Sequence, residues 1–196
     1  MAQTLSEIKQ LLAGRGMRPR HRFGQNFLVD HNKLEQIVKA ADVSADDLVL
    51  EVGPGTGALT ERLLETGARV VAVEIDRDLC DILRHRLGEQ ERFTLIEGDV
   101  LAGKHALNPA VVDAISEWGR RSGVEAHRAD GEMGWHGRPS ADSGPDRGAP
   151  ESEPVESPEF KLIANLPYNI SSPLLAILAA DYPAMSTAIV MIQREV

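Results

Sequence analysis

Hydrophobic and polar residues along this chain alternate between the spacing of strands and the spacing of helices. Short apolar runs of Val, Ile and Leu without polar alternation indicate strands that are buried on both faces. Such runs predict strands over 48–52, 69–75, 93–97, 160–164 and 187–192. Segments with apolar residues three or four positions apart predict helices from residue 59, over 78–87 and over 108–121. This order predicts an α/β fold with a doubly wound, mostly parallel sheet.

Several predicted helices carry start signals. Asp30 is the expected N-cap of a helix with an apolar face formed by Leu34, Ile37, Val38 and Ala41. Asn108 is the expected cap of the 108–121 helix, because Pro109 follows it in the first turn. The segment 171–173, Ser-Ser-Pro, predicts the start of the helix before the last strand, and a short amphipathic helix is predicted over 4–12.

Length and composition indicate one soluble domain. At 196 residues the chain can form one α/β domain and leaves little for a second. No apolar run approaches the roughly 20 residues needed to cross a bilayer, and no apolar segment of a secretory signal is present. The single cysteine, Cys80, cannot form an internal disulfide. We therefore expect a cytoplasmic, monomeric protein with no membrane partner.

Charge is distributed unevenly. Residues 1–39 contain seven Lys and Arg against three acids, although the whole chain carries −9. This basic segment either docks a polyanion or is a solvated arm without a partner. Residues 131–159 contain 14 Gly, Pro or Ser, and seven acids against two arginines, which predicts a disordered insert. We expect a basic arm with a short helix over 1–29 and an α/β domain over 30–196, interrupted at about 131–159.

A glycine-rich turn, Gly53-Pro54-Gly55-Thr56-Gly57, follows the first predicted strand. Glycines let the backbone bend sharply and approach a ligand closely, and the next helix offers free N–H groups at its start. The spacing also satisfies the dinucleotide-binding fingerprint, so NAD and other nucleoside cofactors both remain open. A glycine turn that binds no ligand is the third interpretation.

The next two strands end in carboxylates. Glu74 lies 21 residues after Gly53 (74 − 53), where a carboxylate can bind both hydroxyls of a ribose. Asp99 follows the third strand and can accept a hydrogen bond from an adenine amino group. These strand ends share the edge of the sheet where ligands of open α/β folds bind. We interpret Asp76, which is close to Glu74 in the chain, as a helix cap.

The fourth strand leads into Asn165-Leu166-Pro167-Tyr168, a motif that fits methyl transfer to the amino nitrogen of adenine. The lone pair of that nitrogen is delocalised into the ring, and hydrogen bonds to the Asn165 side-chain oxygen and the Leu166 carbonyl would free it. Pro167 would aim that carbonyl outward, and Tyr168 would stack on a flipped base. The methyl donor would be an activated sulfonium, so neither a general base nor a metal is required.

The motifs together make the chain similar to the ribosomal RNA adenine dimethyltransferases, a family of Rossmann-like class I S-adenosylmethionine-dependent methyltransferases. The resemblance covers most of residues 18–103 and 160–196. It consists of matching segments in the same order: Phe23–Asp30, Leu50–Thr60, Val73–Asp76, Gly98–Val100, Asn165–Ser171 and Gln193–Val196.

The resemblance implies S-adenosylmethionine as cofactor and dimethylation of two adjacent adenosines in a hairpin near the 3′ end of 16S rRNA. The partner would be the 30S particle, and the role would be small-subunit biogenesis. Asn26 and Leu28 would line the methionine end of the cofactor. The cofactor set would be completed by Gly53 at the turn, Glu74 at the ribose, Asp99 at the adenine, and Asn165 between cofactor and target base.

Two features depart from the family pattern. The segment from about Gly103 to Glu159 is longer than the family's connection between the third and fourth strands. The family also continues past the position of Val196 into the last strands of the sheet and a C-terminal helical domain. The resemblance therefore implies that the sequence is truncated before these elements.

Three other functions stay open. One is a 23S rRNA adenine N6-methyltransferase of the antibiotic-resistance type, although the segment from Phe23 to Leu28 favours the small subunit. Another is an inactive RNA-binding factor in ribosome assembly, and the third is an NAD-dependent oxidoreductase. For the acidic insert we hypothesise that its charge weakens nonspecific RNA contacts near the active-site edge, with a tolerated surface loop as the alternative.

Overall fold

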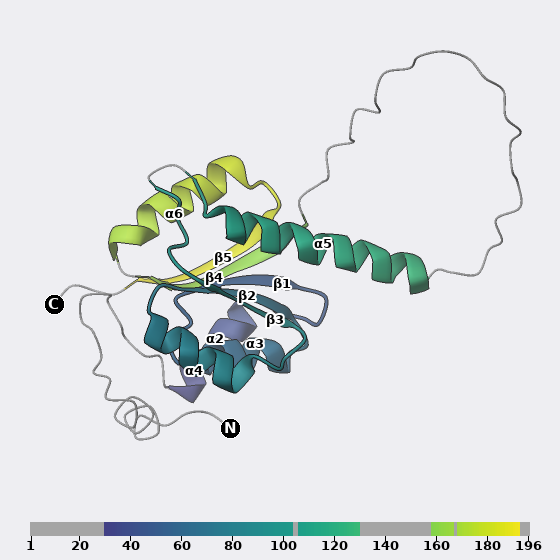
Figure 1. The fold of residues 1–196 in the computed structure, drawn as a ribbon, viewed down its shortest axis with the longest axis horizontal. Coiled ribbons are helices and arrows are strands. Elements are labelled where there is room, and N and C mark those ends of the chain that lie inside the picture. The colour runs from purple at the N-terminus through teal and green to yellow at the C-terminus, as the bar shows by residue number, and fades with distance from the viewer. Residues whose placement is uncertain (1–29, 104–105, 130–157, 167, 193–196) are drawn as a thin grey trace, which may run out of the picture.

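The computed structural model describes residues 30–103, 106–129, 158–166 and 168–192. In these ranges the chain forms a parallel sheet with the strand order β3-β2-β1-β4-β5 (Figure 1). The strands are β1 (Leu48–Val52), β2 (Arg69–Glu74), β3 (Phe93–Glu97), β4 (Phe160–Leu166) and β5 (Met185–Ile192). The predicted doubly wound parallel sheet is therefore confirmed. Its order reverses between β1 and β4, which is where open α/β sheets bind ligands.

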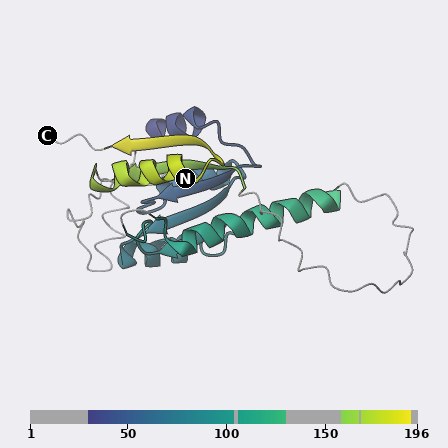
Figure 2. The ribbon, with the colours of Figure 1, turned by 90° about the horizontal axis from the view of Figure 1, so that it is seen from above.

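Helices cover both faces of the sheet. On one face lie α2 (His31–Ala40), α3 (Ala58–Glu65) and α4 (Arg77–Leu87), and on the other lie α5 (Pro109–Ala129) and α6 (Tyr168–Asp181) (Figures 1 and 2). The arm and short helix predicted over 1–29 lie outside the described residues, as does the insert predicted over 131–159 except for its last two residues. Among the described helices, none is long and apolar enough to cross a membrane.

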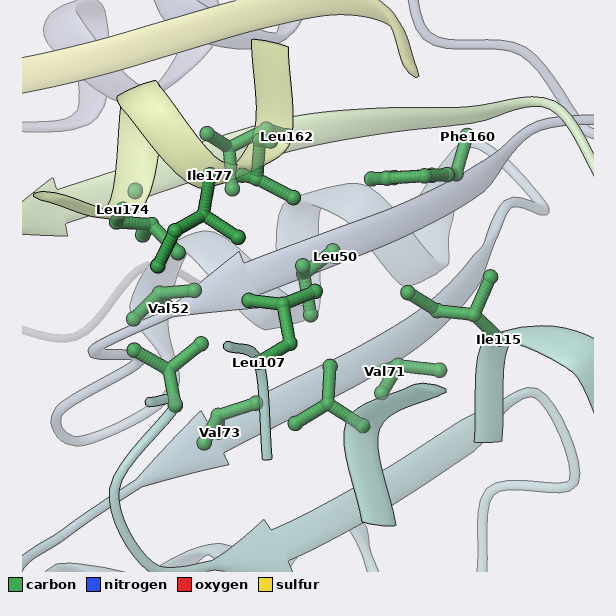
Figure 3. Close-up of a cluster of buried hydrophobic side chains, with 14 of the residues drawn as sticks. Leu50, Val52, Val71, Val73, Leu107, Ile115, Phe160, Leu162, Leu174 and Ile177 are labelled. Atoms are coloured by element: carbon green, nitrogen blue, oxygen red, sulfur yellow. The ribbon is translucent and has the colours of Figure 1, made fainter. Parts of the chain in front are cut away.

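Two hydrophobic cores follow from the alternation of side chains along the strands. In β1, Leu50 and Val52 face the core under α5 and α6, whereas Val49 faces the core under α2 and α3. Figure 3 shows the first core, in which Leu174 and Ile177 of α6 lie over the strands. Each fully buried Leu, Ile or Val contributes roughly 1.5–3 kcal/mol. The apolar runs of the sequence are thus explained by burial on both faces of the sheet.

The predicted helix caps form. The Asp30 carboxylate accepts a hydrogen bond from the N–H of Asn32 at 3.0 Å, and Leu34 of the same helix is buried. The Asn108 side chain accepts from Ala110 N at 3.0 Å. Each cap satisfies a donor that the first turn of a helix leaves unpaired.

Some element bounds differ from the sequence prediction. The helix expected over 108–121 continues to Ala129, since residues 124–126 are compatible with a helix and no proline interrupts it. The helix expected to start at 171–173 begins at Tyr168 and contains Pro173, which removes one backbone hydrogen bond near the helix start. Strands β4 and β5 are each two residues longer than expected, and β2 ends one residue earlier.

The direction of α5 determines where the insert is attached. This helix starts near the carboxyl ends of the strands, runs back across the sheet and extends past the amino edge (Figure 2). The insert therefore leaves the described chain at Ala129 and rejoins it at Pro158, just before β4 begins. Both attachment points lie away from the carboxyl edge, which does not favour our hypothesis that the insert acts near the active-site edge.

Candidate functional site

The glycine turn between β1 and α3 has a backbone that requires glycine. Gly53, Gly55 and Gly57 have φ values of 75°, 61° and 88°, a region that other residues rarely adopt. The N–H of Gly53 donates to the Val73 carbonyl at 3.0 Å, and the N–H of Gly57 donates to the Pro54 carbonyl at 3.0 Å. The turn thus bends sharply at the carboxyl edge of the sheet and directs the chain into the start of α3.

The glycine turn lies directly against the end of β4. A Cβ atom added to Gly53 would lie 3.0 Å from the backbone oxygen of Asn165. This proximity arises because β1 and β4 are neighbours in the sheet, with Val52 paired to Ala164. Two motifs that are more than 100 residues apart in the sequence therefore meet at one point.

Glu74, at the end of β2, is bound to the same turn. Its side chain accepts hydrogen bonds from Gly55 N at 3.1 Å and from Asp76 N at 3.0 Å. The residue is only 6% exposed, and this burial holds the pKa of the carboxyl above its ordinary value, because the N–H groups of Asp76 and Gly55 offset only part of the rise. Each carboxyl oxygen has more than one lone pair, so the group keeps acceptor capacity for the hydroxyls of a ribose.

Asp76 is placed as predicted, as the N-cap of α4. Its side chain accepts from Asp78 N at 3.0 Å.

Asp99 follows β3 on an exposed stretch of the same edge. The preceding residue, Gly98, donates its N–H to the Glu74 carbonyl at 2.8 Å, which holds this segment beside the end of β2. The Asp99 carboxylate accepts from Leu101 N at 2.9 Å, and its backbone carbonyl accepts from the Asn108 side chain at 2.9 Å. The structure therefore fixes the Asp99 backbone at the edge and leaves its carboxylate open to solvent.

The methyl-transfer motif is described in part. Asn165 and Leu166 are the last two residues of β4, and Leu166 is buried in the core under α6. Pro167 lies outside the described residues, and Tyr168 begins α6 without a described side chain. Asn26 and Leu28 also lie outside the described residues. The structure thus brings together Gly53, Glu74, Asp99, Asn165 and Leu166 at one edge of the sheet. It does not place Asn26, Leu28, Pro167 or the side chain of Tyr168.

Glu51 is a buried acid near the site that the sequence analysis did not single out. It is 2% exposed, and the pKa of its carboxyl is raised to about 8. Burial is the main cause of the rise, the Thr60 hydroxyl opposes it, and the charge of Glu74 adds to it. Within the described part of the chain, its Oε2 has no hydrogen-bond partner. The sequence does contain a signal for this residue, because Glu51 is the one charged residue in the apolar run 48–52, which is predicted to be a buried strand.

The arrangement as a whole is suited to a nucleoside ligand. A glycine turn, a buried carboxylate and an exposed carboxylate lie on the ends of three adjacent strands, and Asn165 closes the row on a fourth. Backbone amides at the start of α3 favour negative or polar groups, while the carboxylates accept hydroxyl and amino hydrogens. In the described ranges, no group of His, Cys, Asp and Glu is arranged to hold a metal ion.

A family model described as "Ribosomal RNA adenine dimethylase" matches residues 16–196. The chain belongs to this family. The match includes the glycine turn, both carboxylate strand ends and the Asn165 motif, so it covers every part of the site described above. The family predicted from the sequence is therefore confirmed.

Curated relatives with similar sequences carry the name "Ribosomal RNA small subunit methyltransferase A". The protein from Synechocystis is 37% identical over 192 residues, which cover 91% of this chain and 53% of the relative. The protein from Mycolicibacterium gilvum is 35% identical over 196 residues, which cover 97% of this chain and 48% of the relative. The chain thus spans about half the length of the curated relatives it matches.

Solved structures support the same fold. A dimethyladenosine transferase from Plasmodium falciparum is 25% identical, with a TM-score of 0.52 over 86% of this chain and 44% of that chain. The 23S rRNA methyltransferase ErmE is 23% identical, with a TM-score of 0.54 over 86% of this chain and 48% of that chain. The likeness to ErmE shows a shared fold and carries no information on which ribosomal RNA is the substrate.

Proposed function

We propose that the protein is an S-adenosylmethionine-dependent enzyme that dimethylates the N6 atoms of two adjacent adenosines near the 3′ end of 16S rRNA. Its substrate would be a hairpin in the 30S particle, in the cytoplasm, as a step of small-subunit biogenesis. The observation that carries the proposal is the approach of Gly53 to the Asn165 carbonyl, with 3.0 Å from an added Cβ to that oxygen. This contact supports a single active site in which the glycine turn binds the cofactor and the Asn165 motif binds the target base.

The described residues fit the cofactor. Gly53 has no side chain that would crowd the Asn165 carbonyl, and the Glu74 carboxylate is bound through both oxygens to the backbone N–H groups of Gly55 and Asp76. In the proposed complex, Glu74 binds the ribose hydroxyls and Asp99 accepts from the adenine amino group. When bound, S-adenosylmethionine supplies a methyl group on a positively charged sulfur, an electrophile that needs no metal.

The chain's own residues would prepare the target adenine. The Asn165 side-chain oxygen and the Leu166 carbonyl accept the two hydrogens of the amino group, which pulls the nitrogen towards tetrahedral geometry and makes its lone pair available. These acceptors are fixed by β4, which is paired with strands on both sides. Catalysis then rests on alignment of the nitrogen with the methyl group, and the released proton passes to water.

Methyl transfer to isolated ribosomal particles tests the reaction. The protein is incubated with S-adenosylmethionine and either 30S particles that lack the methylation or protein-free 23S rRNA, and the modified nucleosides are measured by mass spectrometry. We expect N6,N6-dimethyladenosine in 16S rRNA alone, and loss of the product in Asn165→Ala. Modification of 23S rRNA alone would instead show that the protein is a 23S rRNA adenine N6-methyltransferase of the antibiotic-resistance type.

Cofactor binding is tested separately by calorimetry with S-adenosylhomocysteine and NAD. Binding of S-adenosylhomocysteine without methyl transfer to either RNA would favour an RNA-binding assembly factor, while binding of NAD instead would refute the methyltransferase assignment.

A further inference from the structure

The glycine turn rests on α4 as well as on the sheet. A Cβ atom added to Gly57 would lie 2.9 Å from Cδ2 of Leu83 and 3.3 Å from Cδ1 of Leu87. Both leucines are buried residues of α4. The backbone of the turn is therefore in close contact with this helix, and α4 is placed to control its shape.

One side chain of α4 forms polar contacts with the turn. The guanidinium of Arg86 donates a hydrogen bond from one nitrogen to the carbonyl of Thr56 and from the other to the carboxylate of Glu61 in α3. The contacts are largely shielded from water, since the side chains of Arg86 and Glu61 are 19% and 25% exposed. A planar guanidinium suits this task, because its two outer nitrogens point at fixed directions in one plane.

The Thr56 carbonyl belongs to the peptide group that joins Thr56 to Gly57. Its oxygen is held by Arg86, and its N–H, which belongs to Gly57, donates to the Pro54 carbonyl at 3.0 Å. The neighbouring N–H of Gly55 is held by Glu74 at 3.1 Å. Arg86 therefore holds the carbonyl end of this peptide group, and the Pro54 carbonyl holds its N–H end.

We propose that Arg86 is a positioning residue for cofactor binding, one that holds the glycine turn in its binding shape through Thr56 and Glu61. This inference rests on the proposed use of the turn for S-adenosylmethionine. The turn has three glycines at positive φ, so its backbone has many accessible conformations when it is not held. Without Arg86 the folded protein would spend time in turn conformations that do not fit the ligand, which lowers its apparent affinity.

Arg92 provides a matched control. It also donates from its guanidinium to backbone carbonyls, to Gly67 at 2.6 Å and to Ala45 at 3.4 Å. These residues precede β2 and β1, so the contact lies at the amino edge of the sheet, opposite the glycine turn. An effect on general stability is therefore expected for both arginines, and an effect on the turn for Arg86 alone.

The test measures the affinity for S-adenosylhomocysteine by calorimetry, the urea midpoint, and the hydrogen exchange of residues 53–60 without ligand. For Arg86→Ala we expect about tenfold weaker binding and faster exchange in the turn, the loss expected when a charged hydrogen bond is removed. Arg86→Lys, which keeps one donor for the Thr56 carbonyl, should recover part of the affinity. Arg92→Ala should lower the urea midpoint and change the affinity less than about twofold.

The outcomes separate this inference from the proposed function. Unchanged affinity and exchange in a folded Arg86→Ala protein would overturn the role of Arg86 alone. Equal losses of affinity in the Arg86→Ala and Arg92→Ala proteins would also overturn it, because they would indicate a general effect of stability. Failure of the unaltered chain to bind S-adenosylhomocysteine would refute the cofactor and the affinity claim, while the exchange rates would still show whether Arg86 holds the turn.

Discussion

The buried carboxyl of Glu51 predicts that the stability of the chain falls as the pH rises through neutrality. The pKa of this group in the folded chain is raised from 4.5 to about 8, mainly by burial, with the Thr60 hydroxyl opposing the rise and the charge of Glu74 adding to it. In the unfolded chain the group is exposed to water and ionises near 4.5. Between these values the unfolded chain has lost a proton that the folded chain retains, so a higher pH favours unfolding.

The size of the effect follows from the two pKa values. A rise from 4.5 to about 8 corresponds to roughly 5 kcal/mol as an upper limit, lost at no more than about 1.4 kcal/mol per pH unit. This stability is fully present below about pH 4.5 and is lost once the pH exceeds about 8, where both states are ionised. Because domains of this size are stable by about 5–15 kcal/mol, the change should be large enough to measure.

The variant Glu51→Gln removes the ionisable group and keeps its shape. We expect its free energy of unfolding, measured in urea by circular dichroism, to match the unaltered chain near about pH 5 and to exceed it by several kcal/mol near about pH 8.5. The control Glu89→Gln alters an exposed acid just after α4 and should keep the pH dependence of the unaltered chain. A constant difference between Glu51→Gln and the unaltered chain across this range would refute the reasoning.

Other changes test the site and the attachment of the insert. Gly53→Ala should weaken the binding of S-adenosylhomocysteine, measured by calorimetry, at least about tenfold. The new Cβ would lie 3.0 Å from the Asn165 backbone oxygen, and residue 53 has a φ of 75°, which alanine rarely adopts. Unchanged binding would contradict this close packing. Glu74→Gln should weaken the same binding about tenfold, since an amide nitrogen replaces one acceptor for the ribose hydroxyls, whereas exposed Glu89→Gln should not. Deletion of 131–157 should leave this affinity within about twofold, because Ala129 and Pro158 lie away from the carboxyl edge; a large loss would place the insert at the site.

Much of the fold could be read from local sequence because its causes are local. The run 48–52 is a buried strand because both faces of β1 are covered, and Asp30 and Asn108 are caps because each lies within three residues of the N–H it binds. The bounds of helices were harder to predict. Pro173 was expected in the first turn of a helix, but α6 begins at Tyr168 and continues through it, because a proline early in a helix removes a single hydrogen bond and packing can outweigh that loss.

The sequence by itself determined the order of the elements, the positions of Glu74 and Asp99 at strand ends, and the family, because each depends on residues that are close together in the chain. Only the tertiary structure placed Gly53 against Asn165, buried Glu51 deeply enough to raise its pKa, joined Arg86 to the glycine turn, and attached the insert at the far edge of the sheet. These features depend on which strands are neighbours and on how helices pack over them, and such contacts join residues that no local pattern connects.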